Sequence, residues 1–294
     1  MTKEEELLQR LGETAKLERA MVGNYEINYV TMGAGPTLLL IHGANIGWGQ
    51  WYRVLPLLAQ NFSVIAIDLP GAGGSTKFDY GQLQLEPDLV EPVEQFLQQL
   101  GVTNLTIVGH SIGGWLACQL ALRGNISIVA LVLAHSIGFS TTMPIQQHLL
   151  TFRPVAKLLA STLFSPTTRA MKIFLADGFY DSRYLEDILV DYYVESIHRS
   201  RLSHPVLFIN ALTRPFRFKP ELIIRDQVAT LTSPTLFIWG EHDRLFPVRH
   251  QMTQEQIPQA QVEVISQSGH VSFLENPIRF IDIIINFLRG HKVI

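Results

Sequence analysis

Short runs of apolar residues recur along the chain, and most are apolar at successive positions rather than at alternating ones. A strand has this pattern when both faces of its sheet are covered, as in a parallel sheet flanked by helices. Lys16–Val22 and Tyr25–Met32 flank the turn dipeptide Gly23-Asn24, which predicts a β-hairpin. The remaining predicted strands are Thr37–Ile41, Ser63–Ile67, Leu105–Val108, Ile128–Ala134, Thr235–Trp239 and Val262–Ile265.

Segments with the apolar period of a helix lie between these strands. Gly124 fits the C-cap of one of them, and Asn276-Pro277 fits the start of the last. Strands that alternate with helices predict an α/β fold, with a mostly parallel central sheet and right-handed crossovers. The predicted helices are a short charged one within residues 3–14, then Gln50–Ala59, Leu85–Leu100, Ile112–Arg123, Val248–Glu255 and Pro277–Leu288.

The alternation stops between about residues 137 and 220. This stretch has few strand signals and is rich in Phe, Tyr and Leu. Helix-period segments cover Gln146–Leu159, Thr168–Ala176 and Tyr184–Ser200. No low-complexity linker bounds the stretch. We therefore expect a helical insertion that packs on the sheet domain.

Composition narrows the class of protein. The 294 residues carry a formal net charge of −3, so no basic excess points to nucleic acid or to an anionic membrane surface. Hydrophobic residues make up 47% of the chain, which excludes an extended disordered chain. Cys118 is the single cysteine, so an intramolecular disulfide and a multi-cysteine metal site are excluded. With no signal-peptide pattern and no apolar run of spanning length, a cytoplasmic protein is expected.

The strongest chemical motif is Gly109-His110-Ser111-Ile112-Gly113. It follows a predicted strand and opens a predicted helix, which is the context that a G-x-S-x-G nucleophile elbow requires. The sharp turn exposes the hydroxyl of Ser111, and the backbone N–H of Ile112 lies at a helix N-terminus, where it can stabilise an oxyanion. Ser111 is the predicted nucleophile.

A serine needs a base, and the base needs a carboxylate to fix its tautomer. His270 follows the last predicted strand on its carboxyl side, where sites form in open α/β sheets. Asp243 lies in the loop after Thr235–Trp239 and is preferred to Glu241, which is nearer the strand exit. The loop after Ile128–Ala134 has no carboxylate, so it offers no alternative acid. His135 and the other histidines have no comparable context.

The loop after Thr37–Ile41 is the expected source of the second oxyanion donor. We assign that donor to the N–H of Ala44, with the side chain of Asn45 as the less favoured alternative. Trp48 and Phe246 are expected to form walls of the substrate cleft. Asn45 and Val271 complete the predicted substrate-binding residues. No metal-binding, nucleotide-binding or other cofactor motif is recognisable.

Together these motifs resemble the α/β-hydrolase fold superfamily over nearly the whole chain. The resemblance runs through His42-Gly43, the elbow, Gly240-Glu241-His242-Asp243 and Gly269-His270, and the order Ser111, Asp243, His270 is that of the superfamily. It implies an acyl-enzyme mechanism without metal or organic cofactor. It also implies a cap of residues 138–220 over a core made of residues 1–137 and 221–294.

Departures from subfamily patterns restrict the expected reaction. Serine at position 111 disfavours the epoxide hydrolases and haloalkane dehalogenases, which use aspartate. His42-Gly43-Ala44 departs from the proline iminopeptidase pattern, and Val271 stands where C–C hydrolases usually have tryptophan. The expected function is hydrolysis of a small hydrophobic carboxylic ester by a monomer or homodimer. A C–C hydrolase, lactonase or perhydrolase with the same triad stays open, and so does a small-ligand receptor.

Overall fold

The computed structural model describes residues 1–294 except 45, 142, 144 and 248–258, and its main sheet has eight strands. Their spatial order is β1-β2-β4-β3-β5-β6-β9-β10. The pairs β1–β2 and β2–β4 are antiparallel and all others are parallel. The fold is therefore α/β with a mostly parallel sheet, as predicted. The strands are β1 Lys16–Val22, β2 Tyr25–Met32, β3 Thr37–Ile41, β4 Ser63–Ile67, β5 Leu105–His110, β6 Ile128–Ala134, β9 Thr235–Gly240 and β10 Gln261–Ile265.

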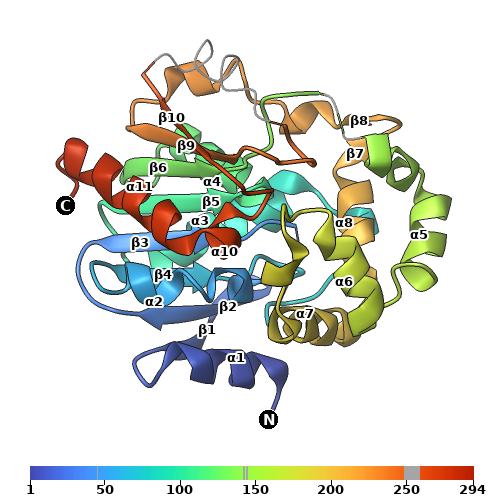
Figure 1. The fold of residues 1–294 in the computed structure, drawn as a ribbon. Helices are drawn as coiled ribbons and strands as arrows, with labels where there is room; N and C mark the ends of the chain where they lie inside the picture. The colour runs from blue at the N-terminus through green and yellow to red at the C-terminus, as the bar shows by residue number, and fades with distance from the viewer. Residues whose placement is uncertain (45, 142, 144, 248–258) are drawn as a thin grey trace.

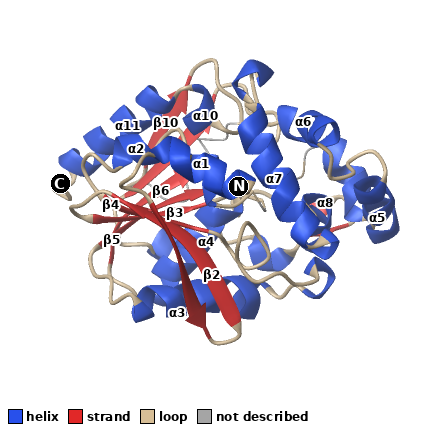
Figure 2. Cartoon of the chain, turned by 90° about the horizontal axis from the view of Figure 1, so that it is seen from below, coloured by secondary structure: helices blue, strands red, loops and turns tan. Residues whose placement is uncertain are grey.

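Successive residues of the central strands face two different cores. In β3, Leu39 and Ile41 pack with helices α3 and α4, whereas Leu38 and Leu40 pack with α2 and α11 on the other face. Figure 2 shows α1, α2 and α11 on one side of the twisted sheet and α3 and α4 on the other. This two-sided burial explains the unbroken apolar runs. These helices are α1 Lys3–Leu11, α2 Leu55–Leu58, α3 Glu91–Gln99, α4 Ile112–Arg123 and α11 Pro277–Gly290.

Two of the predicted helices depart from a regular α-helix. Gln50–Ala59 is two short pieces, a 3₁₀ turn at Trp48–Trp51 and α2. Leu85–Leu100 is divided into a wide π turn at Glu86–Val90 and α3. Pro92 has no N–H to donate to the preceding turn, so a regular helix cannot continue through it. The predicted helix Val248–Glu255 lies outside the described residues.

The elements between residues 138 and 220 lie together at one side of the sheet (Figure 1). Of the three predicted helical segments, Thr168–Ala176 has the predicted bounds, Gln146–Leu159 is divided into a 3₁₀ segment and α5, and Tyr184–Ser200 contains α7. A further helix and a two-stranded hairpin are present that the sequence pattern did not predict. The elements are η4 Ile145–Thr151, α5 Arg153–Ser161, α6 Thr168–Ala176, α7 Asp187–Arg199, α8 Pro205–Ala211, β7 Thr213–Arg214 and β8 Arg217–Phe218. The cap boundaries at 138 and 220 stay a prediction.

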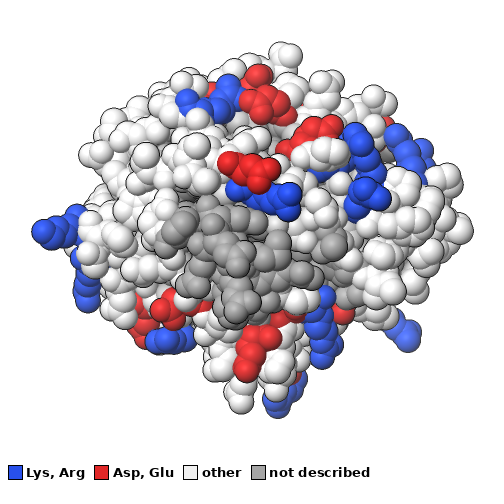
Figure 3. All heavy atoms as spheres, turned by 90° about the horizontal axis from the view of Figure 1, so that it is seen from above, with Lys and Arg blue, Asp and Glu red and all other residues white. Residues whose placement is uncertain are grey.

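Two features of the molecule bear on its surroundings. Within the described part of the chain, no helix combines the length and the apolar character that a membrane crossing needs. On the face seen in Figure 3, the described acidic and basic side chains are interspersed, with no broad field of one sign. Association with nucleic acid and oligomeric state stay predictions.

Candidate active site

Ser111 lies at a strained turn between β5 and α4. Its φ of 54° is in the left-handed region, which a non-glycine residue rarely adopts. A Cβ at Gly109 would collide with the carbonyl of Gly113, and a Cβ at Gly113 would collide with the carbonyl of Ile41. Both glycines of the elbow therefore let neighbouring backbone approach closely. The turn holds Ser111 at the carboxyl end of the sheet, where it lines a pocket.

Asp243 and His270 meet beside this turn, from the loops after β9 and β10. His270 Nδ1 donates to Asp243 Oδ2 over 2.8 Å, which leaves Nε2 free to take a proton. The other carboxylate oxygen accepts from the backbone N–H groups of Leu245 and Phe246 at 2.9 and 2.8 Å. Burial alone would raise the pKa of Asp243, but the charge of His270 and the histidine hydrogen bonds outweigh it and hold that pKa well below its usual range.

A second histidine binds the same carboxylate oxygen. His135, the first residue after β6, donates from Nδ1 to Asp243 Oδ2 over 2.9 Å, and its Nε2 accepts from the hydroxyl of Ser272 at 2.9 Å. It is fully buried, and burial lowers its pKa, so the ring is neutral. His135 thus restrains Asp243 on the side away from His270. No sequence pattern around His135 predicted this role.

The backbone of His270 is fixed from two directions. Its N–H donates to the carbonyl of Gly178 over 2.7 Å, and its own carbonyl accepts from Nε2 of His110 at 2.9 Å. Glu275 joins the same loop to the cap, because its carboxylate accepts from the N–H groups of Gly269, Tyr180 and Asp181. The segment at residues 178–181, within the predicted cap, is therefore part of the frame that holds His270.

The loop after β3 is anchored by neutral side chains. His42 Nε2 accepts from the N–H of Leu69, its Nδ1 donates to the carbonyl of Gly43, and burial lowers its pKa to about 4. Gly43 packs against His110, and its N–H donates to Gln50 Oε1 over 3.2 Å. Ala44 and Ile112 line the pocket together with Ser111. The assignment of their N–H groups to an oxyanion hole stays a prediction.

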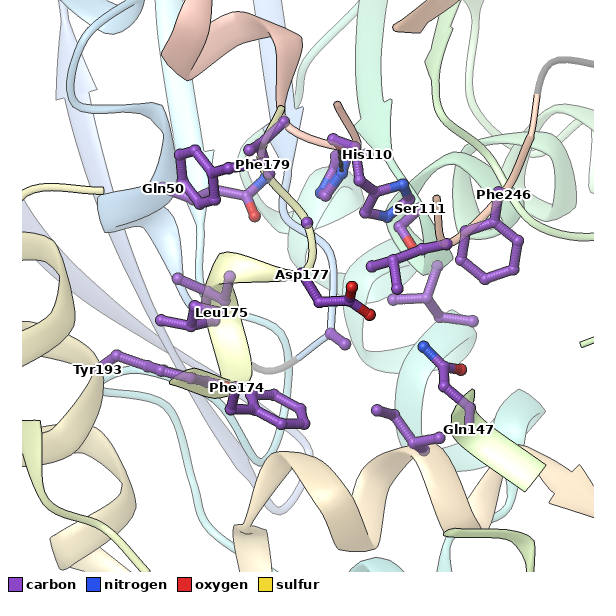
Figure 4. Close-up of a pocket in the computed structure, with 18 of the residues that line it drawn as sticks. Gln50, His110, Ser111, Gln147, Phe174, Leu175, Asp177, Phe179, Tyr193 and Phe246 are labelled. Carbon is purple, nitrogen blue, oxygen red and sulfur yellow. Dashed lines mark hydrogen bonds between the residues drawn. The ribbon is translucent and has the colours of Figure 1, made fainter. Parts of the chain in front are cut away.

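A pocket of about 500 Å³ opens beside Ser111 and His270. Its walls come from the elbow, the loop after β9, and cap elements that include α6, α7 and α8. Figure 4 shows Ser111 and Phe246 at one side of the cavity and the Asp177 carboxylate directed into it. Most lining side chains are apolar, and the described lining contains no lysine or arginine. This size and character suit a small organic molecule.

The family comparison agrees with this geometry. A model of the alpha/beta hydrolase fold family matches residues 36–277. The chain belongs to the α/β-hydrolase fold family. The hydrolase family members it resembles support an enzyme of this type.

Curated relatives of this α/β-hydrolase differ in chemistry. It is 26% identical over 260 residues to a pimeloyl-[acyl-carrier protein] methyl ester esterase of Aeromonas hydrophila, covering 87% of this chain and 96% of that one. It is 28% identical to a 2-hydroxymuconate semialdehyde hydrolase of a Pseudomonas species, covering 87% and 88%. The structure of a membrane phospholipase A shares the fold, with a TM-score of 0.79, 23% identity and coverage of 98% and 90%.

One prediction of a substrate-binding residue in this α/β-hydrolase is wrong. Trp48 is fully buried away from the pocket: its indole N–H donates to Glu4 Oε1 over 3.0 Å, and its ring packs on Tyr192. Hydrogen-bonding of the indole to the N-terminal helix α1 turns the side chain away from the cleft. Phe246 and Val271 do line the pocket, whereas Asn45 lies outside the described residues.

His135, Asp243 and His270 also have the composition of a metal site. One ligand atom from each of His135, Asp243 and His270 lies within 4.8 Å of the others. In the structure these atoms are joined by hydrogen bonds, which a metal ion would have to replace. We therefore interpret the cluster as a hydrogen-bonded group in which Asp243 orients His270, and not as a metal site.

Proposed function

We propose that this α/β-hydrolase is a serine hydrolase that cleaves carboxylic esters with a hydrophobic part through an acyl-enzyme. The observation that carries the proposal is the convergence of Ser111, on its strained elbow, and the His270–Asp243 pair on one apolar pocket. A nucleophile, a base and a carboxylate that orients the base are the parts that acyl transfer requires.

In this mechanism the Ser111 hydroxyl attacks the ester carbonyl while His270 Nε2 takes its proton. The N–H groups of Ala44 and Ile112 stabilise the oxyanion, and His270 then gives the proton to the departing alcohol. Water attacks the acyl-enzyme with His270 again as the base, which releases the acid and restores Ser111. Asp243 stays ionised throughout and stabilises the imidazolium form of His270.

The pocket favours an ester over the substrate of the C–C hydrolase relative. The name 2-hydroxymuconate semialdehyde denotes a carboxylate, and carboxylates are usually bound by arginine or lysine. The described lining offers neither, and Asp177 adds a negative charge. An uncharged ester avoids this repulsion.

The test is turnover of a chain-length series of p-nitrophenyl esters by the wild type and by Ser111→Ala. The proposal predicts turnover that increases with acyl length until the pocket is filled and that is lost in Ser111→Ala. Faster cleavage of a 2-hydroxy-6-oxodienoate than of any ester would favour C–C hydrolysis. Stoichiometric ligand binding without turnover would favour a receptor.

A further inference from the structure

Three side chains of the apolar pocket carry a polar group that has no hydrogen-bond partner within the described part of the chain. Gln50 Nε2 and the hydroxyl of Tyr193 are buried with no hydrogen bond. Asp177 forms no hydrogen bond or ion pair with the described residues, and its carboxylate points into the cavity (Figure 4). Buried polar groups are normally satisfied, so groups left unpaired in a binding pocket are candidates for contacts with a ligand.

Asp177 lies close to the reacting centre. It is the first residue after α6, and the carbonyl of the next residue, Gly178, accepts from the N–H of His270 at 2.7 Å. The carboxyl end of a helix carries a partial negative charge, which adds to the charge of the carboxylate. This part of the pocket therefore attracts a hydrogen-bond donor and repels an anion.

The three groups together indicate which chemical group of a ligand they could bind. An ionised Asp177 can only accept hydrogen bonds, the free N–H of Gln50 can only donate, and the phenol of Tyr193 can do both. Burial raises the pKa of Tyr193 well above its usual range, so its hydroxyl keeps its proton. A hydroxyl group both donates and accepts, whereas a carboxylate cannot donate to Asp177.

We propose that Gln50, Asp177 and Tyr193 form a polar subsite that selects esters bearing a free hydroxyl group and rejects esters bearing a carboxylate. The inference rests on the proposed ester hydrolysis and names its substrate class. Asp177 is the main determinant of this specificity, because it holds the subsite's charge.

Binding to the inactive Ser111→Ala protein tests the subsite without turnover. Propyl hexanoate is the plain reference ester. Glycerol monohexanoate carries hydroxyl groups on the alcohol side, propyl 6-hydroxyhexanoate carries one on the acyl side, and hexanoyl glycolate carries a carboxylate. We expect one hydroxylated probe to bind at least about tenfold tighter than propyl hexanoate, and the glycolate ester to bind weaker.

Two further substitutions in the Ser111→Ala protein show which side chain causes the preference for hydroxylated esters. Asp177→Asn is expected to bring the hydroxylated and plain esters within about threefold of each other and to remove the penalty on the glycolate ester. Tyr193→Phe, which removes one oxygen, is expected to reduce the hydroxyl preference in part. Asp187→Asn changes an exposed cap carboxylate that pairs with Lys172 and should leave all four affinities unchanged.

Kinetics on the same probes separate this inference from the proposed function. Hydrolysis of propyl hexanoate by the wild type, lost in Ser111→Ala, supports ester hydrolysis whatever the selectivity. Equal binding of all four probes, or a hydroxyl preference that Asp177→Asn leaves unchanged, would overturn the polar subsite. Preference for the glycolate ester would overturn it as well.

Discussion

Two carboxylates follow strands of the same sheet and are buried to the same degree, yet their surroundings act on them in opposite ways. Asp243, after β9, is 4% exposed and binds two histidines. Asp68, after β4, is 0% exposed and accepts from the N–H groups of Trp48 and Gly74 and from Asn28. Glu4 shares Asn28 with it: the amide donates to Glu4 Oε1 over 2.8 Å and to Asp68 Oδ2 over 2.7 Å.

The pKa shifts of the two sites follow their partners. Burial disfavours ionisation at both, but the charge that His270 can carry and the hydrogen bonds from both histidines lower the pKa of Asp243 well below its usual range. At the other site burial raises the pKa of Asp68, and burial together with the neighbouring Asp68 raises the pKa of Glu4. The first site is suited to stabilise a charge during a reaction. The second fixes the junction of α1, the β4 loop and the cap.

The largest effect is expected at Asp243. Asp243→Asn keeps the shape of the side chain but offers an N–H to the histidines, so His270 loses the tautomer that can accept the Ser111 proton. We expect kcat to fall by roughly 10⁴-fold on any ester that the wild type hydrolyses, with the protein still folded. Steady-state kinetics and circular dichroism measure this, and a loss under tenfold would contradict the role of Asp243.

The corresponding substitution at Asp68 should affect the stability of the fold and not kcat. Asp68→Asn places an amide N–H group against one of the donors that surround the carboxylate, so a buried hydrogen bond is lost. We expect the free energy of unfolding to fall by about 2 kcal/mol, with kcat of the folded enzyme within about threefold of wild type. Urea denaturation and ester kinetics give the two readouts. A large loss of kcat with unchanged stability would remove the contrast between the two carboxylates.

Substitution of His135 tests whether this histidine positions His270 through Asp243. His135→Ala removes one of the two histidine hydrogen bonds from Asp243 Oδ2, so this oxygen is left with His270 alone and the electrostatic balance between the carboxylate and the base changes. We expect kcat to fall about tenfold or more and the acid limb of the kcat/KM pH profile to shift.

Ser272→Ala provides the matched control, because it removes the bond to His135 Nε2 and leaves the bond to Asp243 in place. Its acid limb should stay near that of the wild type. An unchanged acid limb in His135→Ala would mean that His135 contributes to packing alone.

The smallest effect concerns the pH dependence of stability. Because the folded state raises the pKa of Glu4, the folded protein binds more protons than the unfolded chain above about pH 4, and this group's contribution falls as pH rises. Glu4→Gln removes that dependence. The variant's free energy of unfolding should therefore increase relative to that of the wild type as the pH rises from about 4.5 to about 7.5. A difference that declines with pH would mean that Glu4 is stabilised in its ionised form.

Prediction from the sequence worked best where burial is two-sided. The central strands are apolar at every position because both faces are covered, and β3, β4 and β6 have the predicted bounds. The elbow was recognisable because strand, turn and helix all leave local signals around Ser111. Asp243 and His270 were placed by their positions just after strands.

Residues whose role depends on spatial neighbours were missed or misplaced. His135 follows β6, and only the strand order β5-β6-β9 brings it beside Asp243. Trp48 is near the oxyanion loop in sequence, but its indole is bound by Glu4, 44 positions away. Asp177 had no motif, since its direction into the pocket is set by how the cap packs on the loop of His270.

The central claim is that Ser111 is an activated nucleophile whose base is His270. Labelling with a fluorophosphonate probe, followed by mass-spectrometric mapping of the modified peptide, tests it most directly. The account predicts labelling of the wild type at Ser111 and none in Ser111→Ala or His270→Ala. Absence of labelling in folded wild-type protein, or labelling that persists in His270→Ala, would contradict it.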